Sequence, residues 1–445
     1  MKVQLSRGDI LKSIINAGVV GGGGAGFPTH IKYKGHAEII IVNGAECEPL
    51  LRVDQQFMSL KTEEIIEGLK MAMSVTGATK GIIALKGKYK DAIKAFETIL
   101  PREPSISMHI MGNYYPAGDE QTLVYEVTGK VVPEGGIPLA VGVIVSNVVT
   151  VYNVFRACNG KPVILRPLTV TGEVEKPLTL NVPVGTLIKD VLAFAGGVKI
   201  ENPVIIRGGP MMGSITTDMD QPVTKTDSGL IVLPSTHYLV KNRRLDMKRI
   251  LKHSMMCEQC SYCTMLCPRY MLGHNLQPHM IMRIVGYGLE NASLEDLCQA
   301  FLCCQCGLCS LFSCPVDLQP REVYGGILKE LKEKGISNPH KRKDLVPRPF
   351  MKLHRISAYG LVTRLEVSEY DVKAPWNDME FTPSRVVIPL LQHIGCPSIP
   401  VVKTGDTVKR GQLIGVIPEG SNGASIHASI SGRVVEVSSS VVIER

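Results

Sequence analysis

The sequence predicts a multidomain protein of mixed α/β and α+β class, and three observations support this prediction. A chain of 445 residues is too long to fold around a single core. Apolar strand-like runs alternate with helical patterns as far as about residue 160, which is typical of α/β layer domains. Beyond that point the chain is rich first in short strands, then in cysteine, and finally in glycine and valine. We therefore expect an α/β domain at 1–160, a strand-rich domain at 161–238, a cysteine-rich helical domain at 239–335, a linker at 336–384 and a β-barrel at 385–445.

The first domain begins with an amphipathic helix and a glycine-rich loop. Ser6 is a suitable N-cap for a helix whose apolar positions share one face. In the loop that follows, Gly21, Gly23 and Gly26 match the G-x-G-x-x-G spacing of dinucleotide-binding loops. The context differs, because this loop leaves a helix rather than a strand and runs into a Phe-Pro pair. We interpret it either as a loop whose backbone N–H groups approach an anion or a flat ring, or as a tight turn.

Polar residues gather where two predicted strands of the first domain end. The strand E-I-I-I-V is followed by Asn43 and Glu46, and a second apolar run is followed by Asn147 and Thr150. In α/β sheets, ligands bind beyond the carboxyl ends of the strands. The sequence therefore predicts a binding site at this edge of the first domain.

The segment from 162 to 234 alternates short strands around one helical pattern, at 186–195. This pattern resembles the β-grasp module called SLBB. A glycine-rich turn at 208–213 contains a methionine pair, which more often serves packing than cofactor binding. We expect a structural domain here.

The last sixty residues resemble a lipoyl- or biotinyl-type barrel. The runs VVKTGDTVKRGQLIGV and ASIHASISGRVVEV have the spacing of strands paired across two halves. A carrier domain needs a lysine at its hairpin tip, and the tip region at 419–425 contains none. We therefore expect a barrel without a carrier lysine.

Eight of the 13 cysteines form two motifs of the same kind, each with three cysteines at two-residue spacing and a fourth followed by proline. Such a triplet holds one face of an iron–sulfur cube, and in two-cluster ferredoxins the fourth cysteine ligates the other cluster. The sequence therefore predicts two [4Fe–4S] clusters. The predicted ligands are Cys257, Cys260, Cys263 and Cys314 for one cluster, and Cys303, Cys306, Cys309 and Cys267 for the other.

Other roles for these cysteines fit less well. A zinc ribbon uses four ligands and leaves no role for the third cysteine of each triplet. Disulfides belong to oxidising compartments, and the chain shows no signal peptide. Cys304 is treated as a non-ligand because it breaks the spacing, although the choice between Cys303 and Cys304 stays open. The remaining cysteines are expected to be small buried hydrophobes.

Charge and hydropathy restrict the classes of partner. The formal net charge of +8 is modest for this length, and its densest run, at 329–343, is typical of a helix end and linker. We therefore expect no nucleic-acid binding, whereas an acidic partner or a phosphate-bearing ligand is compatible with the charge. No apolar run approaches about 18 residues, so we expect no membrane insertion.

Several motifs together resemble a known protein family. The runs GGGGAGFPTHIK, VNGAECEP, GDEQ and SNVVT are similar to the flavin- and NADH-binding subunit of respiratory complex I, and more so to the RnfC component of the Rnf complex. The runs CEQCSYCTMLCPRYMLGHNLQPH, YPAGDE and GGPMMG most resemble the propanediol-utilisation cobalamin reductases (PduS-like). The resemblance covers essentially the whole chain. The C-terminal position of the barrel favours the cobalamin reductases over the RnfC component, which has its barrel at the N-terminus.

The resemblance implies an α/β flavin domain, an SLBB domain, a two-cluster ferredoxin-like domain and a lipoyl-like barrel. It implies an FMN shell composed of Gly21, Gly23, Gly24, Lys32, Asn43, Glu46, Gly118, Asp119, Asn147 and Thr150. For NADH it implies that Phe27 stacks on the nicotinamide while Glu48 and Glu120 hold the ribose or amide. Gly22, Ala45 and Ser146 depart from the complex I pattern, and the first two remove charges, so the choice between NADH and NADPH stays open.

The implied activity is an NADH-dependent reduction of cobalamin, in which FMN converts a hydride into single electrons for the two clusters. Implied partners are an adenosyltransferase or another corrin protein, and a shell protein of a bacterial microcompartment. The implied location is the cytoplasm, inside or at the shell of such a compartment. The alternative is a non-catalytic electron-transfer subunit that serves a flavodoxin, membrane or shell partner.

Overall fold

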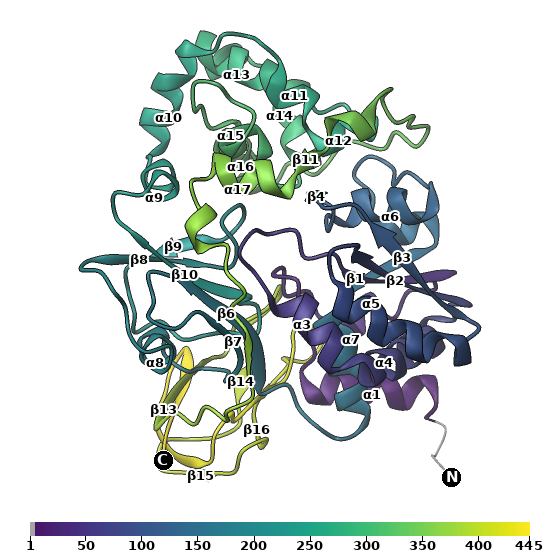
Figure 1. Ribbon diagram of the computed structural model, residues 1–445, viewed down its shortest axis with the longest axis vertical. Helices are drawn as coiled ribbons and strands as arrows, with labels where there is room; N and C mark the ends of the chain where they lie inside the picture. Colours follow the sequence, from purple (N-terminus) through teal and green to yellow (C-terminus); the bar gives the residue numbers. More distant parts are fainter. Residues whose placement is uncertain (1–4) are drawn as a thin grey trace.

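The computed structural model describes residues 5–445, except for the side chain of Glu290. Its four parts surround a common centre (Figure 1). The α/β domain, in purple and blue, lies beside a sheet domain in teal, and a helical domain lies above both. The yellow C-terminal barrel lies under the sheet domain. The predicted class of the protein, with these four kinds of domain, is confirmed.

The α/β domain is built on a parallel sheet of order β3-β2-β1-β5. Its strands are β1 (Ile39–Gly44), β2 (Lys80–Lys86), β3 (Ile106–Met111) and β5 (Val143–Asn147). Its helices are α1 (Arg7–Ala17), α2 (Thr29–Lys32), α3 (Val53–Leu60), α4 (Thr62–Thr76), α5 (Lys90–Ile99), α6 (Glu120–Thr128) and α7 (Val148–Cys158).

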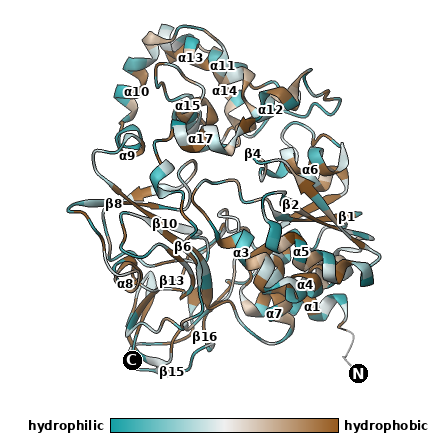
Figure 2. Ribbon diagram, viewed as in Figure 1, coloured by the Kyte–Doolittle hydropathy of each residue, from teal (hydrophilic) through white to brown (hydrophobic). Residues whose placement is uncertain are grey.

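Alternating apolar residues give this sheet two buried faces. Ile40 and Val42 belong to the core formed with α1, α4 and α7, whereas Ile41 belongs to the core formed with α6. Figure 2 shows the hydrophobic residues concentrated along β1, β2 and α4. Because β1 pairs with β2 on one side and β5 on the other, the chain reverses its winding at β1, and Asn43 lies opposite Asn147. A ligand site is expected at such a position.

The middle domain is a six-stranded sheet of order β12-β7-β6-β10-β8-β9 that packs against α8 (Ile188–Phe194). Its strands are β6 (Leu165–Gly172), β7 (Leu178–Pro183), β8 (Pro203–Arg207), β9 (Ser214–Thr216), β10 (Gly229–Pro234) and β12 (Trp376–Asn377). Leu168, Val170 and Leu230 are fully buried beneath α8. The predicted helix within a strand-rich segment is confirmed.

The helical domain consists of short helices separated by the cysteine motifs. They are α9 (Tyr238–Arg243), α10 (Met247–His253), α11 (Tyr262–Met265), α12 (Pro268–Met271), α13 (Pro278–Tyr287), α14 (Leu294–Cys298), α15 (Leu308–Leu311) and α16 (Pro320–Glu333). The longer α13 and α16 supply much of the core, in which Tyr324 is completely buried. No helix among residues 5–445 is long and apolar enough to cross a membrane.

The barrel consists of two small sheets, β13-β19-β18-β15 and β14-β16-β17, around one apolar core. Its strands are β13 (Arg385–Pro389), β14 (Ile399–Pro400), β15 (Thr407–Val408), β16 (Leu413–Val416), β17 (Ile426–His427), β18 (Gly432–Val437) and β19 (Ser440–Glu444). The barrel joins the other domains through backbone hydrogen bonds. Val387 N donates to Gly185 O at 2.7 Å, and Ile394 N donates to Gly26 O, in the glycine loop, at 3.1 Å.

The segment at 336–384 connects the helical domain to the barrel but has more structure than a linker. It contains β11 (Ile356–Ser357), which pairs with β4 (Tyr114–Tyr115), the helix α17 (Ala358–Arg364), and β12, which extends the middle sheet. Leu361, Leu365 and Val367 are buried in a core shared with the α/β, sheet and helical domains. These apolar residues lie between charged residues and prolines, so the composition of the segment concealed them.

Candidate functional site

A cavity of about 560 Å³ opens where the α/β domain meets the middle sheet domain. Its walls come from the glycine loop, the segment after β1, the start of α7 and the loops beside β8 and β10. The residues that line it are Gly22, Gly23, Gly24, Ala25, Glu46, Glu48, Val53, Asp54, Asn147, Arg166, Arg207, Gly208, Gly209, Met212, Gly213, Ser214, Thr224, Thr226, Asp227 and Ser228. This volume lies within the range of small-molecule and cofactor sites.

The glycine loop is held in shape by its neighbours. Gly21 N donates to Phe27 O at 2.9 Å, and Gly22 N donates to Thr150 Oγ1 at 2.8 Å. A side chain at Gly22 would meet Asn147 Oδ1 at 3.1 Å, and Gly24 has a φ of 101°, which favours glycine. The loop therefore presents bare backbone to the cavity, as a site for a flat ring or a phosphate requires.

The structure brings some of the predicted FMN residues together at this cavity. Gly23, Gly24, Glu46 and Asn147 line it directly. Others lie behind its wall: Gly21 and Thr150 fix the loop, while Asn43 Nδ2 donates to Gly118 O at 2.9 Å. The polar side chains of the cavity and the bare glycine loop fit a flavin. The individual flavin contacts that the sequence predicts stay predictions.

Three predicted residues lie away from the described cavity wall. Lys32 Nζ and Glu120 Oε1 form an ion pair at 2.6 Å, with both side chains partly exposed. Phe27 is 38% exposed. Of the residues predicted to contact NADH, Glu48 lines the cavity and Phe27 and Glu120 do not.

We expect Lys32→Ala to lower flavin retention, because the Lys32 ammonium is accessible and a flavin phosphate would displace its partner Glu120. The measurement is the flavin absorbance of the reconstituted protein after gel filtration. Lys34→Ala, on the same stretch of chain, is the matched control. Full flavin retention in Lys32→Ala would place the phosphate elsewhere.

Sequence reasoning missed several charged residues of this cavity. Arg166 is 3% exposed, and its Nη2 donates to Gly22 O at 2.8 Å. Asp54 Oδ2 accepts a hydrogen bond from Asn147 Nδ2 at 2.9 Å. Arg207 Nη2 and Asp227 Oδ2 form an ion pair at 2.6 Å. The sequence feature that could have indicated this site is a single arginine, Arg166, within the apolar strand β6.

Buried carboxyl groups give the cavity unusual acid–base properties. Burial raises the pKa of Glu46, and burial together with the charge of Glu46 raises the pKa of Asp54 to about 8. Burial raises the pKa of Glu48 to about 7, although its carboxylate accepts hydrogen bonds from Met211 N and Met212 N, each at 2.8 Å. Asp54 and Glu48 therefore exchange protons near neutral pH, which suits a site for coupled proton and electron transfer.

We expect the stability contribution of Glu48 to fall as the pH rises. Its pKa is about 7 in the folded chain and near 4.5 when exposed, so its contribution is fully present below 4.5 and is lost as the pH rises through 7. The thermal midpoint of the wild type should therefore fall relative to that of Glu48→Gln between pH 5 and pH 8. Parallel pH profiles of the two proteins would contradict this assignment.

The structure also gathers the predicted cluster ligands into two separate groups. Cys257, Cys260, Cys263 and Cys314 line one cavity. Cys267, Cys303, Cys306 and Cys309 line a second cavity, together with Cys304. These are the two predicted ligand sets, including the exchange of the fourth cysteine between motifs.

The two cysteine loops repeat the same backbone geometry. Gln259 and Ser261 have φ values of 54° and 65°, and the equivalent Gln305 and Gly307 have 56° and 81°. The Gln259 side chain donates to Cys257 Sγ at 3.1 Å, and the Gln305 side chain donates to Cys303 Sγ at 3.4 Å.

The repeat and the chemistry of the donors both favour iron–sulfur clusters. By this repeat Cys303 matches the predicted ligand Cys257, whereas Cys304 matches Glu258. Burial and the neighbouring thiols raise the pKa of Cys263 to about 12, so four thiolates need a bound cationic group to be stable here.

The repeat predicts different results for two adjacent cysteines. Cys303→Ala should lose about half of the iron of the reconstituted protein, because a cluster ligand is removed, whereas Cys304→Ala should retain it. Iron and sulfide analysis after anaerobic reconstitution measures both variants. The reverse pattern would assign Cys304 as the ligand.

Two sets of contacts hold the second cysteine group, one to the α/β domain and one to the wall of the flavin-sized cavity. Tyr115 Oη donates to Cys306 O at 2.6 Å. Asp119 forms two hydrogen bonds with Arg269, at 2.6 and 2.9 Å, and Arg269 follows Cys267 by two residues. Burial opposes ionisation of Asp119, but Arg269 outweighs it and lowers the pKa of this carboxyl group. Asp119 thus anchors the helical domain to the α/β domain.

The loop at 208–213 makes the second connection. Glu48, in the cavity wall, holds the amides of Met211 and Met212. Met211 O in turn accepts a hydrogen bond from Arg321 Nη1 at 3.0 Å, and Arg321 lines the second cysteine cavity. Met211 is buried, as expected for packing.

The first cysteine group lies nearer to the surface. Cys260 is exposed, and the adjacent side chains of Met255, Met256 and Tyr262 are more than half exposed. The neighbouring helix α10 carries exposed Lys248 and Arg249. A partner protein that accepts electrons from this group would contact an apolar and basic surface.

Models of four protein families match successive parts of the chain. They are the Nuo51 FMN-binding domain at 14–156, the SLBB domain at 167–214, the 4Fe–4S dicluster domain at 256–319 and the RnfC barrel sandwich hybrid domain at 371–445. The cobalamin reductase PduS of Citrobacter freundii is 43% identical over 424 residues, which are 95% of this chain and 93% of that protein. The chain belongs to the PduS family.

Other relatives agree with this assignment. The cobalamin reductase PduS of Salmonella typhimurium is 41% identical over 445 residues, which cover 99% of this chain and 97% of that protein. One component of the Na(+)-translocating ferredoxin:NAD(+) oxidoreductase complex of Acetobacterium woodii is 34% identical over 297 residues, 65% of this chain and 62% of that protein. The family predicted from the motifs is therefore confirmed, and so are an FMN-binding and a two-cluster domain for this PduS-family chain.

Proposed function

We propose that this protein is an NADH-dependent cobalamin reductase, a flavo-iron–sulfur enzyme that carries electrons from NADH to cobalamin. The observation that carries the proposal is the contact between its sites within one chain: Glu48, in the wall of the flavin-sized cavity, accepts a hydrogen bond from Met211 N, and Met211 O accepts one from Arg321, which lines the second four-cysteine cavity. The PduS relatives, which are named cobalamin reductases, supply the acceptor.

The residues of the chain have distinct tasks in this function. The bare glycine loop, Asn147 and Glu46 orient the ring of FMN, which when bound accepts a hydride and releases single electrons. Asp54 and Glu48, whose pKa values are raised by burial, hold or release protons beside that ring. The cysteine groups would hold two [4Fe–4S] clusters as one-electron carriers, and Cys260 of the first group is exposed.

The exposed cysteine group offers a docking surface for an acceptor protein. Met255, Met256 and Tyr262 offer apolar contact, and the basic residues of α10 favour an acidic partner surface. We propose an adenosyltransferase or another corrin protein as this partner, in the cytoplasm. A microcompartment shell protein is a second proposed partner, and the exposed outer face of the barrel is available to it.

Anaerobic spectroscopy tests the proposal. The protein is reconstituted with iron, sulfide and FMN, NADH is added, and spectra are recorded before and after the addition of hydroxocobalamin. We expect the flavin and cluster absorbance to bleach and cob(II)alamin bands to appear. Bleaching without cob(II)alamin would contradict a corrin acceptor. No bleaching at all would favour the non-catalytic electron-transfer subunit.

A further inference from the structure

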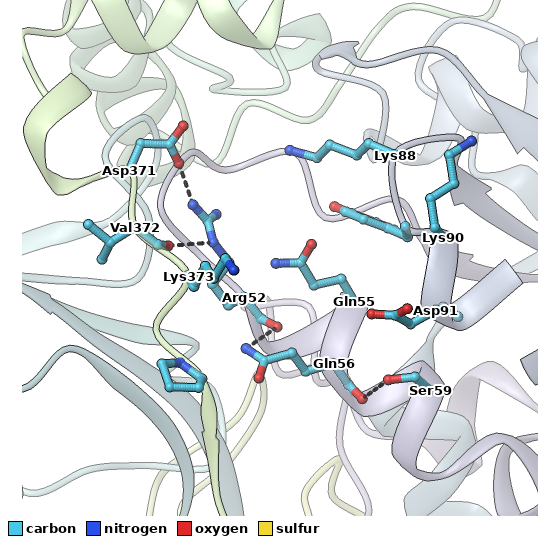
Figure 3. Close-up of a pocket in the computed structure, with 13 residues that line it drawn as sticks. Arg52, Gln55, Gln56, Ser59, Lys88, Lys90, Asp91, Asp371, Val372 and Lys373 are labelled. Atoms are coloured by element: carbon cyan, nitrogen blue, oxygen red, sulfur yellow. Dashed lines mark hydrogen bonds and ion pairs between the residues drawn. The ribbon is translucent and has the colours of Figure 1, made fainter. Parts of the chain in front are cut away.

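A groove of about 510 Å³ lies beside the flavin-sized cavity and has different walls. It is formed by α3, by the loop from β2 to α5, and by the connecting segment at 371–375 (Figure 3). None of the residues that line this groove lines the flavin-sized cavity. The groove is therefore separate from the flavin-sized cavity, and the proposed electron transfer does not involve it.

The groove lies where α/β sheets place anionic ligands. β2 ends at Lys86, and the loop Gly87-Lys88-Tyr89 leads into α5, whose first residues line the groove. The carboxyl end of a parallel strand and the amino end of the following helix attract phosphate groups. A smaller cavity, of about 200 Å³, shares Lys88 with the groove and reaches Lys86.

Several lysines of this region form no hydrogen bond or ion pair with the described residues. Lys86 is only 1% exposed, yet its ammonium group forms no hydrogen bond or ion pair with any described residue. The exposed Lys373 and Lys88 form no such contact either, and Lys88 Nζ lies 5.7 Å from the centroid of the Tyr89 ring. Arg52, by contrast, is paired with Asp371.

Unpaired cations in this arrangement favour an anion. An unpaired buried charge is costly, and a bound anion relieves that cost. Burial and the charges of Lys86 and Arg52 lower the pKa of Lys88 to about 8, because the positive charges of these three side chains repel one another. Figure 3 shows Lys88 reaching across the groove toward Arg52.

The size and the neutral donors of the groove indicate more than a simple anion. Its volume is typical of small-molecule sites and exceeds what one phosphate group fills. The Gln55 amide, below Lys88 in Figure 3, forms no side-chain hydrogen bond within residues 5–445 and offers a donor and an acceptor to a base edge. Pro375 gives an apolar wall.

We propose that this groove binds a nucleoside diphosphate group, with its phosphates at Lys86, Lys88 and the first turn of α5 and its base between Gln55 and Pro375. The ligand is either a free nucleotide or the adenosine diphosphate half of a dinucleotide. Tyr89 Oη donates to Glu46 O at 3.0 Å, so an occupied groove contacts the segment that also lines the flavin-sized cavity.

Calorimetric titration of the reconstituted full-length protein with ADP tests the proposal. Lys88→Ala should weaken ADP binding roughly tenfold or more, because a charge-assisted contact to phosphate is lost. Lys94→Ala, which removes an exposed lysine of α5 outside the groove, should bind ADP as the wild type does. Lys86→Met should also weaken ADP binding but raise the thermal midpoint, since it removes a buried unpaired charge.

Several outcomes decide the proposal. No binding of ADP, equal binding by Lys88→Ala and the wild type, or equal affinity for ADP and inorganic pyrophosphate would overturn it. Where ADP binds as expected, competition by NADH identifies the dinucleotide as the source of the diphosphate, and its absence identifies a free nucleotide. The flavin and iron contents of each variant are measured in parallel, so a failure of the electron route remains distinguishable.

Discussion

Cys263→Ser is expected to halve the iron of the reconstituted protein, from about eight to about four atoms per chain. Cys263 lines the surface group of cysteines together with Cys257, Cys260 and Cys314, and its loss leaves three thiolates for that cluster. NADH-driven bleaching of the flavin should persist, because the flavin-sized cavity connects through Glu48, Met211 and Arg321 to the other cysteine group, which keeps its four thiols. Cobalamin reduction should fall to near background, since the exposed exit is removed.

Cys396→Ser is the matched control for this experiment. Cys396 is exposed, so the burial expected for it from the sequence was wrong, and it lies in the barrel, far in sequence from both cysteine motifs. Its substitution should leave iron, sulfide and activity unchanged. If Cys263→Ser kept the full iron content, the assignment of ligands to the surface group would be wrong.

Arg269→Gln is expected to destabilise the junction between the α/β and helical domains by about 3–5 kcal/mol. Arg269 and Asp119 are both nearly buried, so the substitution leaves the Asp119 carboxylate without its charged partner. We expect a lower midpoint of thermal unfolding and slower bleaching of the clusters than of the flavin after NADH is added. The iron content should stay complete, because Arg269 is not a cluster ligand.

Lys130→Gln tests whether burial is the reason for this effect. Lys130 pairs with Glu38 at 3.1 Å, but both side chains are exposed, and such a pair contributes about 0–1 kcal/mol. The free energy of unfolding of Arg269→Lys should lie between those of Arg269→Gln and the wild type, because lysine keeps the charge and loses one of the two hydrogen bonds. Wild-type unfolding of Arg269→Gln would refute a structural role for the pair.

Local patterns were enough to predict the parts of the site that lie close together in the chain. The repeated cysteine spacing predicted both ligand groups, and the polar ends of two strands predicted a binding site at the sheet edge where Asn43 and Asn147 lie side by side. Arg166 reaches the flavin-sized cavity through the packing of two domains, and Asp54 through the packing of α3 beside the start of α7, neither of which a local pattern describes.

The segment at 336–384, which was expected to be a linker, also shows that local patterns do not predict burial between distant parts of the chain. Leu361 and Leu365 have helical spacing, but charged residues and prolines around them dominate the composition of the segment. Their burial depends on apolar partners, among them Tyr115 and Met211, that come from distant parts of the chain. A short helix with few apolar residues becomes stable only once those partners are in place.

The contact between the barrel and the glycine loop has a consequence for biosynthesis. Ile394 N bonds to Gly26 O, and the buried Lys225 Nζ bonds to both Gly18 O and Ser425 O. The glycine loop is therefore synthesised well before the barrel residues that complete its contacts. Loading of the flavin should accordingly follow synthesis of residues 385–445, and nascent chains that lack them should not retain it.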